Sequence, residues 1–269
     1  MSRAGAIAGE LLAADASGSL LPLITAREAG FGLAEAFDVL DQIRARRIAG
    51  GARPVGWKIG FTNRTLWDRY GVHAPIWAPV WDTTTTLLDG TRAELSLAGL
   101  CQPRIEPEVV FGFARAPRAG MDAAELTGCL AWVAHGFEFV HTHFDGWKFT
   151  AADCLADFAL HGRLLVGPRV PVVRFGELGA ELAALRAELY REDLCVDTGV
   201  ASCVLDGPLN ALRLWIDAMA RHTPQWLVRA GDLVTTGTIT DAWPVAAGQC
   251  WRSTLSDARL AGLEVETTE

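Results

Sequence analysis

No stretch of this 269-residue sequence is an apolar run long enough to cross a lipid bilayer, although half of its residues are hydrophobic. Near the start, a short apolar patch is broken by Glu10 and Asp15, so we expect an amphipathic helix there and not a signal peptide. The length is sufficient for one large domain or two modest ones with a substantial core. We therefore expect a folded globular protein that does not span a membrane.

Basic residues are in the minority. Lys and Arg number 24, against 32 Asp and Glu, and the formal net charge is −8. This balance provides no basic surface for nucleic acid and disfavours binding to anionic membranes. We therefore expect neither nucleic acid nor a membrane as a partner, although a local cationic pocket for an anionic small molecule is compatible with the total charge.

Cys-x-x-Cys spacings are absent, as are internal repeats, low-complexity tracts and long linkers. The scattered cysteines predict reduced, mostly buried thiols in a cytoplasmic protein, and they argue against a zinc or redox site. They are Cys101, Cys129, Cys154, Cys195, Cys203 and Cys250.

The hydrophobic spacing predicts a mixture of helices and short strands. A capping box at Thr25–Glu28 opens a predicted helix that ends at Gly50, and Asp206 and Pro208 mark the start of another. The other predicted helices are 63–70, 122–134 and 151–159, with the last at 207–222; the predicted strands are 54–62, 104–114, 136–142, 163–167, 182–192, 232–236 and 248–254. This order indicates an α+β fold, with a mainly helical N-terminal domain at 1–85 and a β-rich domain at 86–269.

Two glutamates interrupt an apolar segment at residues 102–111. If this segment is a strand, Glu106 and Glu108 point to the same face and lie about 7 Å apart. A third carboxylate, Glu138, stands alone in the apolar run 136–140. Such carboxylates repel one another and lose hydration unless a cation compensates, and three of them suit Mg²⁺ or Mn²⁺. The alternative is an ordinary solvated strand face.

One cation, Lys58, lies between Trp57 and Ile59 in the predicted strand 54–62. It is either an exposed strand lysine or a partly desolvated lysine whose lowered pKa suits proton transfer. Asp82, at the end of a proline-punctuated apolar loop, either faces a site or caps a turn.

Six motifs occur in the order in which the 2-keto-4-pentenoate hydratases carry them, and the chain resembles that family from about residue 20 to its end. The motifs are Val55–Thr62, Gln102–Glu108, Gly136–Val140, Trp147–Asp153, Leu155–Asp157 and Gly231–Gly237. The family belongs to the fumarylacetoacetate hydrolase superfamily. The resemblance implies that the β-rich part is a mixed β-roll of the fumarylacetoacetate-hydrolase type and that the protein is a homo-oligomer.

The resemblance also implies a chemistry. Family members add water to 2-hydroxy-2,4-dienoates from aromatic-compound degradation, and the product is a 4-hydroxy-2-oxo acid. Glu106, Glu108 and Glu138 are then the ligands of Mg²⁺ or Mn²⁺, which binds the carboxylate and the 2-oxygen of the small-molecule substrate.

Other residues acquire roles from the same resemblance. Lys58 is the implied general acid/base, and Asp82 is a weaker candidate for orienting water or the lysine. The substrate carboxylate is implied to lie near a loop of small residues, which are Thr236, Gly237 and Thr238.

The chain departs from the family pattern at Phe158–Gly162 and in the loop Val72–Trp81, and both departures concern the wall around the substrate tail. His161 is a candidate substrate-binding residue or proton donor, with a core position as the alternative. Three further histidines bracket Glu138 and are candidates for hydrogen bonds that orient it, but we do not expect any of them to be a metal ligand. They are His135, His141 and His143.

Three functions are compatible with these residues. The first is the metal-dependent hydratase. The second uses the same chelate for another reaction of the superfamily, either decarboxylation of a 4-oxalocrotonate-type 2-oxo acid or hydrolysis of a carbon–carbon bond in an acylpyruvate. The third is a non-catalytic ligand-binding homologue, which the presence of all three acids and Lys58 disfavours. A cationic group placed for a second substrate carboxylate would favour the decarboxylase.

Overall fold

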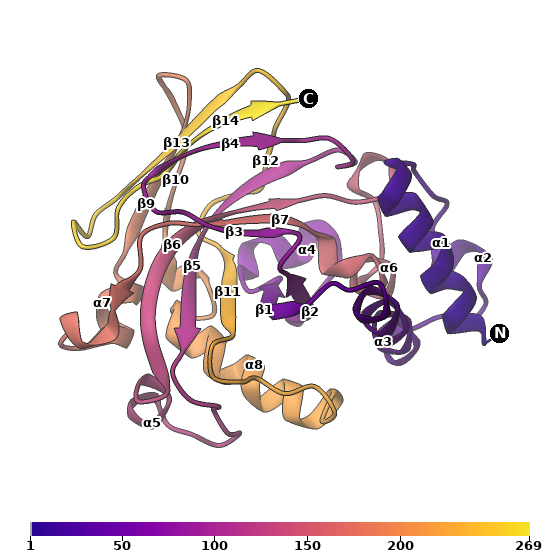
Figure 1. Ribbon diagram of the computed structural model, residues 1–269, viewed down its shortest axis with the longest axis horizontal. Coiled ribbons are helices and arrows are strands. Elements are labelled where there is room, and N and C mark those ends of the chain that lie inside the picture. The colour runs from indigo at the N-terminus through magenta and orange to yellow at the C-terminus, as the bar shows by residue number, and fades with distance from the viewer. Residues whose placement is uncertain (1) are drawn as a thin grey trace.

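Two β-sheets form the centre of the structure, which is a computed structural model that describes residues 2–269 (Figure 1). The strands of the larger sheet are β1 (Pro54–Gly60), β2 (Ile76–Trp81), β3 (Thr85–Leu87), β5 (Arg104–Phe113), β6 (Leu130–Val140), β7 (His161–Val166), β8 (Val170–Pro171), β11 (Leu233–Thr238) and β12 (Trp243–Pro244). Their main order is β2-β1-β11-β5-β6-β7-β3, with β12 beside β5 and β8 beside β6. Parallel pairs join β1 to β11 and β3 to β7, so the sheet is mixed.

The smaller sheet packs against one face of the larger one. Its strands are β4 (Arg92–Ser96), β9 (Arg186–Arg191), β10 (Leu194–Val200), β13 (Cys250–Leu255) and β14 (Glu264–Thr268), in the order β10-β9-β13-β14-β4. Phe137 and Phe139 of β6 share a buried cluster with Leu189 and Trp251 of the smaller sheet. Because side chains alternate along a strand, packing these rings on one face turns Glu138 to the other.

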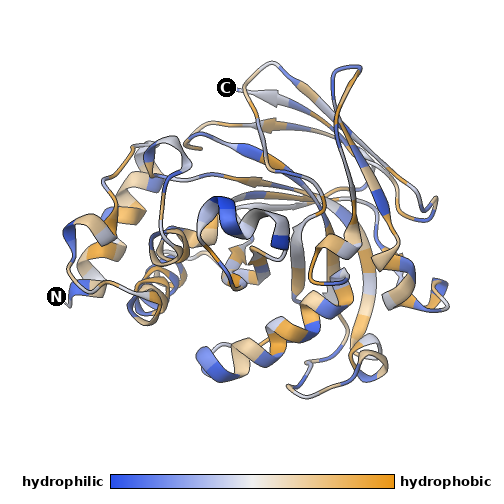
Figure 2. Cartoon of the chain, turned by 180° about the vertical axis from the view of Figure 1, so that it is seen from behind, coloured by the Kyte–Doolittle hydropathy of each residue, from blue (hydrophilic) through white to orange (hydrophobic). Residues whose placement is uncertain are grey.

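Helices cover the remaining surfaces of the larger sheet (Figure 1). They are α1 (Arg3–Ser17), α2 (Ile24–Arg27), α3 (Leu33–Ala49), α4 (Trp67–Tyr70), α5 (Ala123–Thr127), α6 (Ala151–Ala156), α7 (Leu178–Ala183) and α8 (Pro208–His222), with 3₁₀ turns at Arg64–Leu66, Asp145–Trp147, Phe158–Leu160, Val172–Arg174 and Ala201–Cys203. Hydrophobic and hydrophilic residues alternate along α8 (Figure 2), and its apolar stripe buries Leu212, Trp215 and Met219.

The predicted α+β class is confirmed, and several element boundaries were wrong. The helix predicted at 122–134 is only α5, because the apolar run from Leu130 onward is the first half of the long strand β6. The helix predicted from Thr25 is split into α2 and α3, and the Thr25 hydroxyl donates to Asp153, 2.7 Å away, instead of closing a capping box.

The last helix begins at Pro208, as predicted, but Asp206 does not cap it. Its carboxylate instead accepts hydrogen bonds from Arg64, and the N-cap residue is Gly207. The domain boundary at 85 and 86 stays a prediction, although β1, β2 and β3 lie in the same sheet as β5. All six cysteines are free thiols. Within residues 2–269, no helix combines the length and the hydropathy that a membrane span requires.

Candidate metal centre

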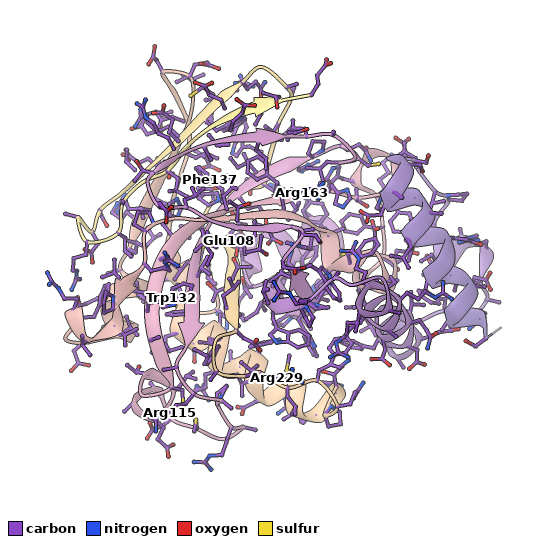
Figure 3. The ribbon with its side chains drawn as sticks, viewed as in Figure 1. Glu108, Arg115, Trp132, Phe137, Arg163 and Arg229 are labelled. Atoms are coloured by element: carbon purple, nitrogen blue, oxygen red, sulfur yellow. The ribbon has the colours of Figure 1, made fainter. Side chains whose placement is uncertain are left out.

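Two neighbouring strands bring the three predicted carboxylates together. Glu106 and Glu108 share one face of β5, and Glu138 of β6 is the direct cross-strand partner of Glu106. One oxygen from each of the three groups lies within 4.8 Å of the others. Figure 3 shows Glu108 in the middle of the molecule, with Phe137 nearer the smaller sheet. Such a cluster is too close to remain fully ionised without a compensating charge.

Strand β11 holds Glu108 in a fixed orientation. Oε2 of Glu108 accepts a short hydrogen bond from the hydroxyl of Thr235 and another from the backbone N–H of Gly237, at 2.7 Å. Gly237 has a φ of 102°, and a Cβ there would lie 1.8 Å from Oγ1 of Thr62, so this approach requires glycine. Burial, together with the charges of Glu138 and Glu106, raises the pKa of Glu108 well above its usual value.

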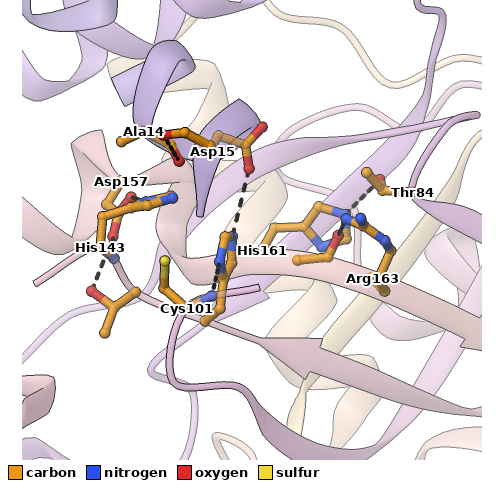
Figure 4. A network of polar contacts seen from close by, with 12 residues as sticks. Ala14, Asp15, Thr84, Cys101, His143, Asp157, His161 and Arg163 are labelled. Carbon is orange, nitrogen blue, oxygen red and sulfur yellow. Dashed lines mark hydrogen bonds and ion pairs between the residues drawn. The ribbon is translucent and has the colours of Figure 1, made fainter. Parts of the chain in front are cut away.

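Glu138 is fully buried and has two cationic or donor neighbours. Nζ of Lys58 lies 3.2 Å from its Oε2, and Nδ1 of His161 lies 2.8 Å from its Oε1. Burial alone would raise the pKa of Glu138, but Lys58 and His161 outweigh that effect and lower it. Because the carboxylate accepts from Nδ1, Nε2 of His161 is left to accept from the hydroxyl of Thr84, 2.8 Å away (Figure 4).

Lys58 reaches this cluster from a strand that is not a direct neighbour of β5 or β6. Its strand, β1, is separated from β6 by β11 and β5, a lateral distance of about 14 Å in a flat sheet. The 3.2 Å contact with Glu138 therefore requires a curled sheet and an extended lysine side chain. Burial lowers the pKa of Lys58, but the three carboxylates outweigh this and raise it. The lowered pKa predicted from the sequence therefore depends on the charge of a divalent cation beside Lys58.

The donor set fits a hard divalent cation. Oε1 of Glu108 and Oε2 of Glu138 are buried without a hydrogen-bond partner within residues 2–269. Burial raises the pKa of Glu106 to about 7, against an opposing effect of Lys58. Two buried carboxylate oxygens without a hydrogen bond, one of them paired with Lys58, and the neighbouring carboxylate of Glu106 are oxygen ligands that Mg²⁺ or Mn²⁺ would satisfy.

A pocket opens beside Glu106 and Lys58. Its wall includes four aromatic side chains, Phe61, Tyr70, Trp147 and Phe149, and its polar lining includes Thr62 and Asn63. Apolar walls with a few polar groups are typical of sites for small organic ligands.

Arg104 contacts two aromatic side chains of this pocket and lies on the same face of β5 as Glu106. Its guanidinium lies 4.1 Å from the ring centre of Trp147, and its Nη1 donates to the hydroxyl of Tyr70 at 3.0 Å. No carboxylate within residues 2–269 forms a salt bridge with it.

The loop of small residues lies partly in the pocket. Gly237 and Thr238 line it. The hydroxyl of Thr236 is turned away and donates to the carbonyl of Val109, 3.0 Å away. Thr235, which the sequence analysis did not select, is the hydroxyl that reaches Glu108; strand alternation from Gly237 would have identified it.

The structure does not bring Asp82 to the cluster. It follows β2 near Pro54, four residues along β1 from Lys58, and its carboxylate accepts hydrogen bonds from the backbone and the guanidinium of Arg53. These hydrogen bonds lower the pKa of Asp82. These contacts fit the interpretation of Asp82 as a turn residue and not the interpretation that it faces the site.

The hydrogen bond that orients Glu138 comes from His161. None of the three histidines that bracket Glu138 in the sequence forms it. His135 contacts the carbonyl of Glu108 and the hydroxyl of Ser253, while His141 and His143 lie in a separate cluster. His161 itself lies behind Glu138 instead of lining the pocket. This contact joins β7 to β6 and was not visible in the linear spacing.

No family model matches the chain, but known proteins do. It is 30% identical over 195 residues to a 2-keto-4-pentenoate hydratase of Paraburkholderia phymatum, which covers 72% of this chain and 71% of the relative. It is 28% identical to a 4-oxalocrotonate decarboxylase of a Pseudomonas species over 97% of both chains. The solved structure of the 4-oxalocrotonate decarboxylase from Pseudomonas putida G7, complexed with magnesium and adipate, superposes with a TM-score of 0.89 at 22% identity, covering 99% of this chain and 98% of the other.

Proposed function

Because this chain belongs to the 2-keto-4-pentenoate hydratase family, we propose that it is a divalent-metal-dependent hydratase that converts a 2-hydroxy-2,4-dienoate into a 4-hydroxy-2-oxo acid. The observation that carries the proposal is the convergence of Glu106, Glu108 and Glu138 with Lys58 beside a pocket that Glu106 and Lys58 line. A 2-hydroxydienoate of the type formed in aromatic-compound degradation presents a carboxylate and a 2-oxygen to that wall.

The reaction requires proton transfers that the chain can perform. When bound by the three glutamates, Mg²⁺ or Mn²⁺ supplies positive charge that stabilises negative charge on the substrate oxygens. Ketonisation moves the proton of the 2-hydroxyl to carbon 5 and leaves a double bond between carbons 3 and 4. Water then adds its hydroxyl to carbon 4 and its proton to carbon 3. Lys58 lines the pocket, so its Nζ is the group positioned to carry these protons.

The other residues prepare the site for this chemistry. His161, itself bonded to Thr84, holds one oxygen of Glu138, and Thr235 holds one oxygen of Glu108, so each carboxylate keeps its other oxygen available for the metal. The aromatic walls exclude bulk water from the substrate, which strengthens the electrostatic effect of the bound cation.

The test is turnover of 2-hydroxypenta-2,4-dienoate by protein loaded with Mg²⁺. We expect loss of the dienol absorbance without release of carbon dioxide, and we expect EDTA to stop the reaction. Metal-loaded protein that leaves the dienol unchanged, or turnover that is indifferent to EDTA and to Mg²⁺, would refute the hydratase proposal.

A second candidate is decarboxylation of a 4-oxalocrotonate-type dicarboxylate, and Arg104 is the observation that favours it. Its guanidinium contacts Trp147 and Tyr70 of the pocket wall, and within the described residues it forms no salt bridge with an acidic side chain. Because Arg104 is two residues from Glu106 on the same strand face, it is about 7 Å along the strand from the metal site, where a second carboxylate of the substrate would lie.

Arg104→Gln separates the two candidates. If the substrate is a dicarboxylate, the variant raises KM for 4-oxalocrotonate at least tenfold, because one charge-assisted hydrogen bond is lost. Arg104→Lys should then restore part of the affinity. Arg252, which stacks on Tyr190 in the smaller sheet at 4.0 Å, provides the matched control Arg252→Gln. Release of carbon dioxide by the wild type identifies the decarboxylase; a monocarboxylate turned over equally by wild type and Arg104→Gln argues against it.

The assembly and the cellular location are further parts of the proposal. The family resemblance supports a homo-oligomer, and the six free thiols support a cytoplasmic location. Light scattering of the purified protein measures the assembly directly, and a monomer at micromolar concentration would overturn the oligomer.

A further inference from the structure

A second group of metal-ligating side chains lies outside the carboxylate centre (Figure 4). It consists of Asp15 near the end of α1 and of His141 and His143, which follow β6. One ligand atom from each lies within 4.8 Å of the other two. The three residues come from segments about 125 residues apart in the chain, so the fold and not the local sequence brings them together.

His143 is the residue that points to a ligand. Its Nδ1 lies 2.6 Å from Oδ1 of Asp157, and the other oxygen of Asp157 accepts from the backbone N–H of His143 and from Thr142. When the ring is neutral, its proton is therefore on Nδ1, and Nε2 presents a lone pair. The His143 side chain is 0% exposed, and its Nε2 has no hydrogen-bond partner within residues 2–269.

An aspartate that bonds the Nδ1 of a histidine is the arrangement that orients histidine ligands of metals. A buried imidazole nitrogen without a partner is costly, and a bound cation removes that cost. Asp157 and His143 therefore form a preoriented nitrogen ligand.

Asp15 and His141 complete the group. Oδ2 of Asp15 pairs with Arg47 at 2.8 Å, while its Oδ1 lies 3.9 Å from Nε2 of His141. Asp15 is 28% exposed and lines a surface hollow with Arg47 and Thr84, which provides a route from solvent.

One contact must change when a metal binds. Nδ1 of His141 accepts from the backbone N–H of Cys101 at 3.3 Å, so the ring proton is on Nε2. Ligation through Nε2 moves that proton to Nδ1 and breaks this long hydrogen bond, whereas His143 needs no such rearrangement.

We propose that Asp15, His141 and His143 form a second cation site, suited to a divalent transition metal such as Zn²⁺ and distinct from the Mg²⁺ or Mn²⁺ centre. Two imidazoles and one carboxylate suit Zn²⁺ better than they suit Mg²⁺ or Mn²⁺, and water would supply the fourth ligand. The site joins α1 to the segment after β6. The cysteine pattern argued against zinc, but this set uses no thiolate.

The experiment uses the full-length chain with Glu106→Gln, which disables the carboxylate centre and isolates the second site. Co²⁺ is the probe, because a four-coordinate nitrogen–oxygen environment absorbs visible light much more strongly than six-coordinate oxygen ligation. We expect one Co²⁺ per chain with a four-coordinate spectrum, displaced by Zn²⁺ and not by Mg²⁺. Adding His143→Gln abolishes the spectrum, and adding Asp15→Asn weakens Co²⁺ binding at least tenfold.

The matched control is His222→Gln, which removes an exposed histidine and should leave the spectrum unchanged. Circular dichroism and thermal unfolding confirm that each variant is folded, and Asp15→Asn keeps the test informative if His143→Gln fails to fold. Absence of Co²⁺ binding in the Glu106→Gln protein, a spectrum that persists without His143, or binding that is lost with His222 would each overturn the site. None of these outcomes depends on hydratase turnover, so the two proposals fail independently.

Discussion

Replacing Glu106 by Gln tests the electrostatics of the carboxylate centre in the metal-free protein. The variant keeps the shape of the side chain but removes its charge. Burial raises the pKa of Glu106 from 4.5 to about 7. Between these two values the folded protein holds a proton that the unfolded chain has released, so stability falls as pH rises through this window.

The pKa difference sets the magnitude. The difference between 4.5 and about 7 corresponds to roughly 3 kcal/mol, which we take as an upper value. We expect the metal-free wild type to lose up to this amount of unfolding free energy between pH 5 and pH 8. Metal-free Glu106→Gln should lose less than the wild type, and it should be more stable than the wild type at pH 8.

Urea denaturation in EDTA at pH 5 and pH 8 measures these stabilities, and calorimetry measures Mg²⁺ binding. Glu94→Gln on the exposed face of β4 is the matched control, and it should show the pH dependence of the wild type. We also expect Glu106→Gln to lose Mg²⁺ affinity and turnover while remaining folded. Normal metal binding in this variant, or equal destabilisation at both pH values, would refute the reasoning.

Three other substitutions test the residues around the centre. Lys58→Ala should lower turnover by about 10²–10⁴-fold and leave Mg²⁺ affinity nearly unchanged in calorimetry, whereas loss of metal would assign Lys58 a structural role. His161→Ala should weaken Mg²⁺ binding by about 10–100-fold, because Glu138 loses the hydrogen bond that orients it; unchanged affinity would contradict this role. Thr235→Val should weaken Mg²⁺ binding, while Thr236→Val, whose hydroxyl bonds the carbonyl of Val109, should not; equal effects would exclude a specific function of Thr235.

Much of the centre could be predicted because strand periodicity determines which side chains share a face. Glu106 and Glu108 are two residues apart on β5, and the apolar neighbours of Glu138 fix its orientation on β6. The family motifs then related the two strands and added Lys58. The helix at 207–222 was equally predictable, since Pro208 fixes its start and its apolar spacing is regular.

The remaining features depend on contacts that no local pattern encodes. Thr25 stands at a sequence position typical of a helix cap, but its hydroxyl donates a hydrogen bond to a buried carboxylate of α6. Leu130 is the first residue of a strand, although the sequence predicted that it lies near the end of a helix. Its cross-strand pairing with Phe113 outweighs the helical propensity of the segment. His161 and Thr84 meet through the parallel pairing of β3 with β7, and the sequence alone gives no register for that pair.

The pairing of β1 with β11 has a consequence for biosynthesis. Lys58 is the register partner of Thr235, so 177 residues separate two neighbours in the sheet. When only the first two hundred residues have emerged from the ribosome, β11 is still missing. Strands β1 and β5, which it separates in the finished sheet, then have unpaired edges. Contacts of this sequence separation form late and slowly, and the exposed edge can pair with other chains in the meantime. Acquisition of Mg²⁺ should therefore coincide with release of the finished polypeptide, and chaperone capture should act on the nascent chain before that moment.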